Sequence, residues 1–474
     1  MTLSICDPQF PQISEILESS FMLEVLQNSL FGNIEQGSPM LKIERCSVGE
    51  KRHKPGKSFL LSYHLGLQDI ATGIRYEQLL SAQLCLPGQG LSEFEAYLGN
   101  GLDKRLDIHE HSPIRIPPVS YVPEVDMLLW AFPNDRKLPH LPKLLDTENL
   151  ASYFAIHLSD LWLSPSEHIT SVQTKLMHYL PECSCMIRYT LTIADESSGS
   201  ETRQIILYGK NYPDDSGVEA YSIMRQLVEQ TCHFAKPYSY DAETKTLWQS
   251  HVPGEPFEWT SALVENHRLI AKVAVCIAAF HGCTLDATGC YGFSDIDVQL
   301  KATCDLAAVA DSTLGERVQA AVQVIQLNYK QLNWNNTLIT PIHLDLKMGN
   351  LLISDEGVTL IDMDCVRLGD PLLDIGSFVA NLYLNGLRFG STVAEIDKVV
   401  AIFCNEYCAA VDWVVDHAKL TWYISAALIH EVVRRSLRQQ NVERLKQVGA
   451  IIKLSNHFSA LCRKDISGAS YASK

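Results

Sequence analysis

Hydrophobic and polar positions alternate with two different periodicities along this chain. After Gly37 and Pro39, short apolar runs separated by turn-forming residues are typical of β-strands. From Ser261 onward, apolar residues recur at helical spacing, as in residues 263–282, which end at Gly282, a common helix C-cap. Four further segments are predicted to be helical: residues 1–35, which would form an N-terminal cap, and residues 375–389, 393–418 and 420–460. The pattern therefore predicts a strand-rich part followed by a helical part.

The strand-rich part contains an internal repeat. Pro55, Ser58 and Tyr63 recur 126 residues later as Pro181, Ser184 and Tyr189. Further pairs keep the same order with offsets of 118 to 124: Glu95-Ala96-Tyr97 with Glu219-Ala220-Tyr221, Ser120-Tyr121 with Ser239-Tyr240, Leu129-Trp130 with Leu247-Trp248, and Pro133 with Pro253. We infer a duplicated lobe of about 120 residues, whose second copy spans residues 168–255.

Candidate chemistry is concentrated in residues 339–376. Three polar residues interrupt the apolar background at fixed spacing: His343, Asp345 and Asn350. Two short apolar runs joined by turn-forming residues then predict a hairpin that ends at Asp362. Phosphoryl transfer needs a base near the acceptor hydroxyl and Mg²⁺ on the phosphates, and Mg²⁺ prefers oxygen ligands. Asp345 is thus a candidate base, and Asn350 and Asp362 are candidate metal ligands.

In this register the residues resemble the aminoglycoside phosphotransferase and choline kinase family of the protein-kinase-like fold. Three family motifs occur in order: His-x-Asp-x-x-x-x-Asn at His343, Asp345 and Asn350, an Ile-Asp-Met-Asp segment at 361–364, and Gly-Asp-Pro-x-x-Asp at Gly369, Asp370, Pro371 and Asp374. The resemblance makes Asp345 catalytic and gives Asn350, Asp362 and Asp364 to the metal, with Asp364 either on a second metal or facing the acceptor. It makes His343, Asp370 and Asp374 scaffold residues. Lys347 either contacts the transferred phosphate or faces solvent.

The second copy resembles the family's nucleotide-binding lobe. Its strand-turn-strand, residues 175–193, would cover the phosphates. Lys210 would hold the α- and β-phosphates with Glu219 as its partner, or Glu229 as the alternative partner. Gln249 and His251 lie in the segment that would bind adenine through its main chain.

The turn of that strand-turn-strand departs from the family pattern. Glu182 and Cys183 stand where basic residues are usual. A carboxylate facing phosphates would repel them. Either Glu182 points to solvent, or the affinity for nucleotide is lowered.

The first copy lacks this chemistry. Gln83 stands where Lys210 stands in the second copy, and an amide cannot replace a cation opposite phosphates. The segment around Gly56 is not a P-loop, because the required first glycine is Lys51. We expect the first lobe to bind no nucleotide and to serve packing, substrate covering or homodimer formation.

Composition narrows the remaining classes. The 474 residues are 46% hydrophobic and 20% charged, as in an ordinary globular protein. A net charge of −16 without a long basic run argues against nucleic-acid binding. The 14 scattered cysteines suggest reduced thiols rather than a zinc or disulfide framework. The acidic N-terminus predicts no export signal, and the most apolar helix, residues 269–280, is too short to span a membrane, so we expect a cytoplasmic protein.

We therefore predict an α+β, bilobal protein-kinase-like fold, with an antiparallel β N-lobe and a helical C-lobe, preceded by a degenerate extra N-lobe. The expected parts are 1–150 (degenerate lobe with its helical cap), 151–255 (nucleotide-binding lobe), 256–466 (helical lobe) and 467–474 (disordered tail). The expected activity is transfer of a phosphoryl group from ATP, with Mg²⁺, to a hydroxyl of a small molecule such as an amino sugar, a sugar, an amino alcohol or a natural product. The alternative is a nucleotide-binding pseudokinase that acts as a scaffold for protein partners. A protein kinase fits less well, because no Ala-Pro-Glu segment or long activation loop follows Asp362.

Overall fold

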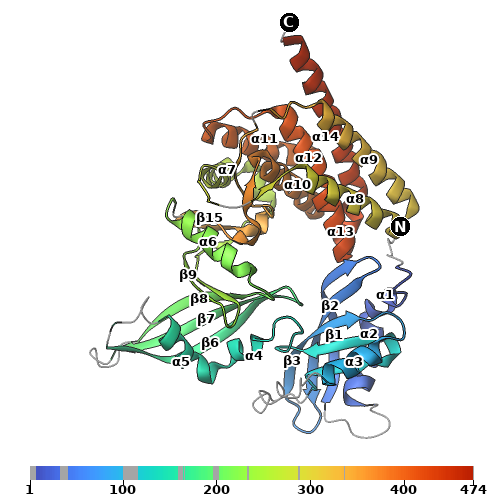
Figure 1. Ribbon diagram of the computed structural model, residues 1–474, viewed down its shortest axis with the longest axis vertical. Helices are drawn as coiled ribbons and strands as arrows, with labels where there is room; N and C mark the ends of the chain where they lie inside the picture. Colours follow the sequence, from blue (N-terminus) through green and yellow to red (C-terminus); the bar gives the residue numbers. More distant parts are fainter. Residues whose placement is uncertain are drawn as a thin grey trace. The chain divides into compact units, whose positions relative to one another are not determined.

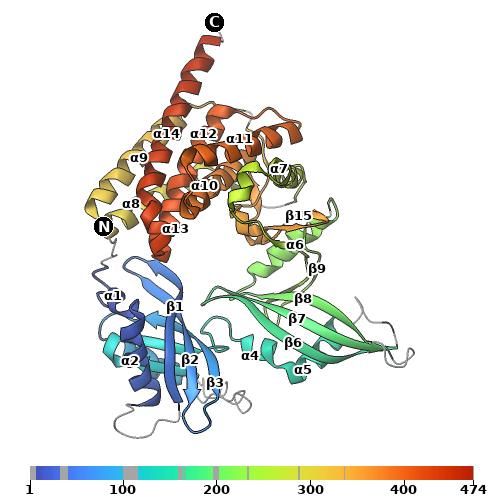
Figure 2. The same ribbon diagram turned by 180° about the vertical axis from the view of Figure 1, so that it is seen from behind.

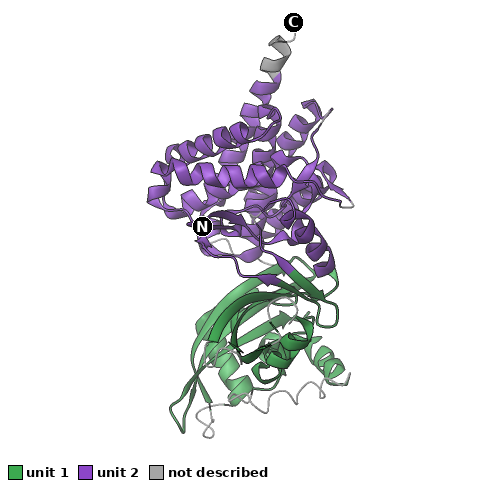
Figure 3. Cartoon of the chain, turned by 90° about the vertical axis from the view of Figure 1, so that its left-hand side faces the viewer, with its two compact units in different colours: residues 1–215, 238–248 green, residues 216–237, 249–474 purple. Residues whose placement is uncertain are grey.

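The computed structural model divides the chain into two compact units, shown in two colours in Figure 3. The first unit comprises residues 1–215 and 238–248, and the second comprises residues 216–237 and 249–474. The residues that the structure describes are 7–32, 41–99, 116–158, 164, 166–195, 202–231, 234–286, 289–335 and 337–472. Each unit is described by itself. The four-part division that the sequence predicts stays a prediction.

The first unit contains a five-stranded antiparallel sheet in the order β1-β2-β3-β5-β4. Its strands are β1 (Leu41–Lys54), β2 (Ser58–Asp69), β3 (Arg75–Leu84), β4 (Val119–Val122) and β5 (Met127–Ala131). Helices α1 (Ile13–Ile16) and α2 (Ser19–Phe31) pack on this sheet, and α3 (Gly90–Gly99) follows β3 (Figure 1). The apolar faces of α1, α2 and the sheet form one buried cluster that includes Ile13, Leu26 and Tyr63.

A second five-stranded sheet repeats the first, in the order β6-β7-β8-β10-β9. Its elements are α4 (Leu141–Leu145), α5 (Thr147–His157), β6 (Glu167–Leu180), β7 (Ser184–Asp195), β8 (Thr202–Asn211), β9 (Pro237–Asp241) and β10 (Thr246–Ser250). The first three strands of the two sheets have the same lengths in the same order, 14, 12 and 10 residues. The predicted duplication of the lobe is thus confirmed.

Each of the two copies contains an equivalent internal hydrogen bond. The Tyr63 hydroxyl donates to the backbone oxygen of Ile16 at 2.8 Å, and the Tyr189 hydroxyl donates to that of Leu144 at 2.9 Å. Strand pairing also supports the predicted alignment of Gln83 with Lys210, because Gln83 lies opposite Leu60 and Lys210 lies opposite Met186, 126 residues further on.

The repeat is longer than the sequence reasoning found, because the N-terminal helices belong to it. Each copy starts with a buried aspartate, Asp7 or Asp135, followed three residues later by an apolar residue and then proline. Asp7 accepts a hydrogen bond from the Gly56 backbone at 2.8 Å, and Asp135 accepts one from the Glu182 backbone at 3.0 Å. Each aspartate therefore ties the start of its copy to the turn between the first two strands. The shared pattern Asp-x-x-[Phe/Leu]-Pro at residues 7–11 and 135–139 could have revealed this.

The second unit is mainly helical (Figures 1 and 2). Its α-helices are α6 (Ser216–Val228), α7 (His267–His281), α8 (Phe293–Ala310), α9 (Ser312–Gln331), α10 (Pro371–Phe389), α11 (Val393–Ala410), α12 (His417–Ala427), α13 (Arg434–Gln439) and α14 (Val442–Ala472). A π-helix, η7 (Leu428–Val433), joins α12 to α13. Helices α8 and α9 pack against each other, and α9 also packs on α14, as Figure 2 shows from behind. Both helices lie within residues 284–335, a segment for which the sequence analysis assigned no elements.

Two small three-stranded sheets carry the loops of the candidate site. One is β11 (Glu255–Pro256), β14 (Leu351–Ser354) and β15 (Gly357–Leu360), and the other is β12 (Cys290–Tyr291), β16 (Arg367–Gly369) and β13 (Thr340–Ile342). The predicted hairpin is β14-β15, with Ser354 paired to Gly357. Gly357 has φ of +145°, which suits glycine at this turn.

Helix boundaries in the second unit differ from the predicted ones. The segment 393–418 is divided, because α11 ends at Ala410 and Asp416 caps the next helix by accepting from the Lys419 backbone. The segment 420–460 is interrupted at the π-helix and at Gln440, whose φ of +47° ends α13. Helix α14 extends to Ala472, into the predicted disordered tail, and residues 473–474 lie outside the described residues. In the described part of the chain, no helix has the length and apolar character that a membrane span requires.

Candidate active site

The loop after β13 is fixed by Asp374 in the first turn of α10. The Asp374 carboxylate accepts hydrogen bonds from the backbone N–H groups of His343 and Leu344 at 2.5 and 3.0 Å. It also contacts the His281 ring on α7 at 3.2 Å. Leu344 has φ of +61°, a conformation that is costly for a branched side chain and is usually held by its surroundings. The two hydrogen bonds from the loop to the buried Asp374 carboxylate hold Leu344 in this conformation.

His343 joins the loop to the strand that precedes Asp362. Its Nδ1 accepts from the Asp345 backbone N–H at 3.3 Å, so its Nε2 carries the proton and donates to the Ile361 backbone oxygen at 2.9 Å. The ring is completely buried. In this structure His343 therefore acts as a brace between two loops, in agreement with the scaffold role that the resemblance implies.

Asp345 lies between two cations. One carboxylate oxygen is ion-paired with Lys347, and the other contacts the Arg435 guanidinium at 2.6 Å. Burial alone would raise the pKa of Asp345, but Arg435 and Lys347 outweigh it and hold that pKa below its usual value. The carboxylate is thus ionised at neutral pH. Of the two expectations for Lys347, the structure shows it paired with Asp345 and partly buried.

Arg435 is a site residue that the sequence reasoning missed. It is the second residue of α13 and lies four residues after Glu431 of the π-helix. Glu431 accepts a hydrogen bond from the Ser377 hydroxyl at 2.5 Å, and burial raises its pKa to about 7. The signal in the sequence was a carboxylate four residues before an arginine inside an apolar helical segment, which is an unusual place for either charge.

The predicted metal ligands Asn350 and Asp362 are close in the backbone. The Ile361 N–H donates to the Asn350 backbone oxygen at 2.9 Å, so Asp362 follows directly after a residue bonded to Asn350. The Asn350 amide nitrogen donates to the Asp345 backbone oxygen at 3.0 Å, which leaves its amide oxygen as the atom able to face a cation. Asp362 has φ of +71°, and Asp364 lies two residues on in η6 (Met363–Cys365).

This donor set fits Mg²⁺ that is shared with a nucleotide. One amide and one or two carboxylate oxygens match a cation that keeps several ligand positions for phosphates and water. Among the described residues, no group of three or more His, Cys, Asp or Glu side chains is placed to hold a metal ion.

The predicted nucleotide residues lie in both units. Lys210 is the penultimate residue of β8 in the first unit, with its ammonium 5.7 Å from the Tyr212 ring. Glu219 on α6 belongs to the second unit, where it forms an ion pair with Arg367 at 3.2 Å. The pairing of Lys210 with Glu219, or with Glu229, stays a prediction.

The predicted adenine segment begins at the end of β10. Gln249 lies in β10 and is half-buried, and His251 follows in an exposed loop. The Ser250 N–H donates to the Lys236 backbone oxygen at 2.8 Å. Gly254, with φ of +126°, lies against the backbone of Ile353, and an added Cβ would be 2.7 Å from the Ile353 oxygen. A tight glycine contact therefore anchors this segment to the hairpin that leads to Asp362.

The structure changes the interpretation of Glu182. This residue does not point to solvent: it is buried, and it forms a two-pronged ion pair with Arg136, both contacts measuring 2.6 Å. Lys137 lies 3.4 Å away. The neighbouring Cys183 receives a hydrogen bond from Arg52 of the first copy. The Glu182 carboxylate, which departs from the family pattern, is thus compensated by its ion pair with Arg136 and is not exposed to solvent.

Comparison with known families identifies the part of the chain that carries this site. Residues 210–413 match the model of the phosphotransferase enzyme family, APH. The matched segment includes Lys210, the loop of Asp345 and Asn350, and the Asp362 segment. The match supports a phosphotransferase enzyme. A sequence comparison with curated proteins finds no significant match.

The solved structures that resemble this chain include two choline kinases and a spectinomycin phosphotransferase. A choline kinase from Cryptosporidium parvum is 10% identical, with a TM-score of 0.47, over 68% of this chain and 98% of its own. The choline kinase LicA from Streptococcus pneumoniae is 14% identical, with a TM-score of 0.43, over 65% and 99%. A spectinomycin phosphotransferase, APH(9)-Ia, in complex with ADP and spectinomycin, is 13% identical, with a TM-score of 0.44, over 66% and 98%.

Proposed function

We propose, on the premise that residues 210–413 match the phosphotransferase enzyme family, that this protein transfers the γ-phosphoryl group of ATP to a hydroxyl of a small molecule. The observation that carries the proposal is the geometry of Asp345. It is an ionised carboxylate on a loop held by Asp374 and His343, and its backbone oxygen is bonded to the proposed metal ligand Asn350.

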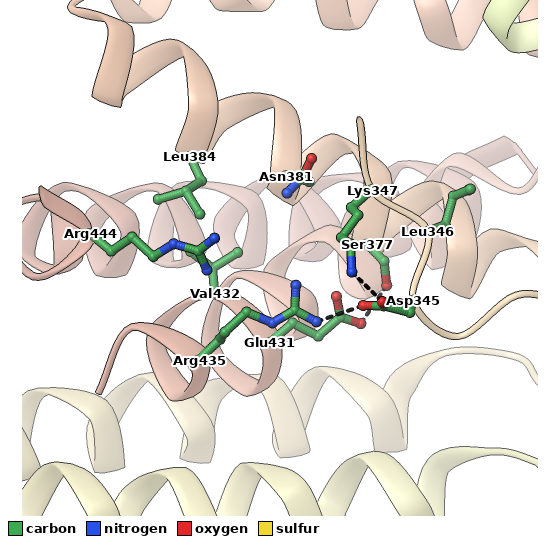
Figure 4. A pocket seen from close by; sticks show the side chains of 10 residues that line it. All are labelled: Asp345, Leu346, Lys347, Ser377, Asn381, Leu384, Glu431, Val432, Arg435 and Arg444. Carbon is green, nitrogen blue, oxygen red and sulfur yellow. Dashed lines mark hydrogen bonds and ion pairs between the residues drawn. The ribbon is translucent and has the colours of Figure 1, made fainter. Parts of the chain in front are cut away.

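In this proposal Asp345 binds the acceptor hydroxyl and receives its proton. A carboxylate with a lowered pKa is a weak base, so its main role is to orient the hydroxyl, with proton transfer late in the reaction. Lys347, which is paired with Asp345 in the structure (Figure 4), would contact the transferred phosphoryl group. Mg²⁺, when bound, neutralises charge on the phosphates. Asn350, Asp362 and Asp364 would hold the metal ion.

The proposal also assigns the residues that bind the nucleotide. Lys210, supported by Glu219, binds the α- and β-phosphates, and the main chain of residues 249–251 binds adenine. Because the Glu182 carboxylate is paired with Arg136, it adds less repulsion towards phosphates than an unpaired carboxylate would.

The first test is calorimetric titration of ATP with and without Mg²⁺, on the wild type and on Asp362→Ala. We expect binding that depends on Mg²⁺ and that falls at least about tenfold in the variant, a change of ~1.4 kcal/mol. A wild type that binds no nucleotide would remove the basis for a kinase and favour the scaffold alternative.

The second test is Asp345→Asn. We expect ATP binding to remain while turnover falls by about 10² to 10⁴, the usual contribution of a positioned acid–base group. ADP release with an acceptor panel is the measurement. Unchanged turnover in this variant would rule out Asp345 as the group that acts on the hydroxyl.

A further inference from the structure

The turn between β6 and β7 is enclosed, whereas the equivalent turn of the first copy is open. Pro181 and Glu182 are buried, but their equivalents between β1 and β2 are half-buried at Pro55 and exposed at Gly56. The two turns occupy the same place in their sheets, and each is anchored by the aspartate that starts its copy. The difference in burial therefore comes from what surrounds the second turn and not from the fold of the lobe.

The first copy supplies part of that enclosure. Arg52, on β1, donates a hydrogen bond to the Cys183 thiol. The Arg136 guanidinium donates to the Tyr97 hydroxyl on α3 at 3.2 Å, and the same guanidinium holds the Glu182 carboxylate. Two connections thus run from the first copy to consecutive residues of the turn, one directly and one through Arg136.

Tyr97 is itself held in place within the first copy. Its ring packs edge-on against the Trp130 ring of β5, with 5.7 Å between the ring centroids. Both side chains belong to a small apolar cluster in which Trp130 is buried. The hydroxyl that contacts Arg136 is therefore carried by a packed side chain, which can fix the position of its partner.

Apolar contacts connect the first copy to the strand that leads into the turn. Leu79 of β3 packs against the buried cluster of the second copy, which also includes Phe132 and Tyr179. The Phe132 and Tyr179 rings are 5.0 Å apart, and the Gln78 side chain donates to the Phe132 backbone oxygen at 3.0 Å. Tyr179 precedes the turn by two residues. Packing and hydrogen bonds thus hold the turn from the same side.

The enclosed turn borders the residue that would bind phosphates. Strands β7 and β8 are antiparallel, and Lys210 lies opposite Met186, three residues after Cys183. The turn and Lys210 therefore lie at the same end of the sheet. A loop that is already ordered in its binding conformation saves the cost of ordering when the ligand arrives. Contacts that hold this turn therefore bear on phosphate binding.

We propose that the first copy supports the nucleotide site: through Arg52 and Tyr97 it holds residues 181–183 in the conformation that receives the phosphates of ATP. The inference rests on the proposed function for the identity of the ligand. Arg52 and Tyr97 are positioning residues, because they act through side chains of the second copy and of the segment between the copies. The copy without a phosphate-binding lysine thereby contributes to the activity of the other.

The test uses the full-length double variant Arg52→Gln/Tyr97→Phe, which keeps the ion pair of Glu182. The matched control is Arg45→Gln/Tyr63→Phe. It removes an exposed ion pair from the same strand β1 and a buried tyrosine hydroxyl from the same copy, and neither of these groups contacts the turn. The control therefore separates loss of stability in the first copy from loss of the contacts to the turn.

The first readout is hydrogen exchange of the backbone amides in a peptide that covers the turn, followed by mass spectrometry without nucleotide. We expect exchange in the double variant to be at least about threefold faster than in the wild type, because two hydrogen bonds that oppose local opening are lost. The control should exchange at the wild-type rate in this peptide.

The second readout is calorimetric titration of ATP with Mg²⁺. The double variant should bind ATP at least about threefold more weakly, because ordering of the turn is then paid on binding. The control should keep the wild-type affinity although its melting temperature is lower. Tyr97→Phe alone should give both changes at smaller size, so it decides the question if the double variant does not fold.

Three results would overturn the inference: unchanged exchange of the turn in the double variant, faster exchange with unchanged ATP affinity, or an equal loss of affinity in the control. Failure of the proposed function looks different. If the wild type binds no ATP, the proposed function fails and this inference fails with it. If the wild type and the double variant bind ATP equally, the proposed function stands and only the role given to the first copy is wrong.

Discussion

Glu182 illustrates how one buried charge depends on one partner. Its side chain is 3% exposed and paired with Arg136, and its backbone N–H donates to Asp135. Its φ of +58° is unusual for a side-chain-bearing residue. At the equivalent position in the first copy stands Gly56, with φ of +64°, for which that conformation is easy. The second copy thus keeps the glycine-like turn with a charged residue, and Arg136 compensates for the charge.

Arg136→Ala should destabilise the protein by about 3 to 5 kcal/mol, because the Glu182 carboxylate would stay buried without its main partner. The measurement is the free energy of unfolding in urea. Arg75→Ala is the control, since Arg75 and Glu44 form an exposed pair on the first sheet and its loss should cost much less stability than the loss of Arg136. Equal effects of the two substitutions would contradict the role given to Arg136.

Glu431 should make stability depend on pH. Burial raises its pKa from 4.5 to about 7, so between these values the folded protein holds a proton that the unfolded chain releases. Its contribution to stability is complete below about pH 4.5 and is lost as the pH rises through about 7. The loss is at most ~3 kcal/mol at about 1.4 kcal/mol per pKa unit.

Glu431→Gln should remove this dependence, because the amide stays neutral at every pH. We expect the drop in melting temperature between pH 5 and pH 8 to be smaller in the variant than in the wild type. Parallel melting curves for the two proteins across that range would show that Glu431 does not titrate as inferred.

At the scale of elements, the first turn of α10 positions the catalytic loop. Asp370 caps the helix by accepting from the Leu372 backbone, and Asp374, one turn later, accepts from two backbone groups of the loop. The helix and the loop are 30 residues apart in sequence but share these bonds. A rigid helix end thus fixes where Asp345 lies.

Asp374→Asn should lower kcat by at least about tenfold and leave ATP affinity nearly unchanged. An asparagine offers one accepting oxygen to two backbone donors, and leaving a buried donor unsatisfied costs about 1 to 3 kcal/mol. Asp397→Asn on α11, where the carboxylate accepts only from the Tyr383 hydroxyl in the described contacts, is the isosteric control and should retain activity. The readouts are steady-state kinetics and ATP titration.

The sequence predicted correctly those elements that are marked by local signals. The β14-β15 hairpin, the strand-turn-strand of β6 and β7, and α7 with Gly282 after its last residue were each marked by turn residues or helical spacing, and the structure confirms them. Helices α8 and α9 were missed, because the sequence analysis assigned no elements to residues 284–335. The π-helix could not be predicted, since no residue in Leu428–Val433 marks a change of helical pitch.

The candidate site was predicted where a motif carried it and missed where only tertiary contact did. Motif spacing and the family resemblance singled out Asp345, Asn350 and Asp362, and their roles stay predictions. Arg435 lies 90 residues from Asp345 in sequence, and only packing of α13 beside the catalytic loop brings them together. Likewise, the burial of Glu182 in an ion pair with Arg136 could not be predicted, because Arg136 lies 46 residues earlier and no local pattern links the two residues.

At the scale of the whole molecule, the chain contains two copies of one lobe with different chemistry. The copies share sheet order, strand lengths, the Tyr63 and Tyr189 bonds and the Asp7 and Asp135 bonds. They differ at Gln83 and Lys210, which occupy the same register. The fold of the lobe therefore does not require the lysine.

ATP should bind with a stoichiometry of one per chain. Lys210→Gln, which gives the second copy the residue of the first, should weaken ATP binding by at least about tenfold. Gln83→Lys should not create a second site, because the first copy is not followed by the Asp345 and Asp362 loops. Calorimetric stoichiometry and affinity for the three proteins are the measurements. Two ATP molecules per wild-type chain would refute the assignment of the first copy.

The shared bonds of the two copies also have a consequence for mutational scanning. Both lobes belong to one polypeptide, so they are always present at equal concentration and under the same selection. Each position of the second lobe therefore has an equivalent position in the first lobe with the same structural role, but without the proposed role in nucleotide binding. A substitution tolerated at Gln83 but not at Lys210 reports on phosphate binding, whereas one rejected at both Tyr63 and Tyr189 reports on folding. The molecule carries its own reference for separating stability from activity.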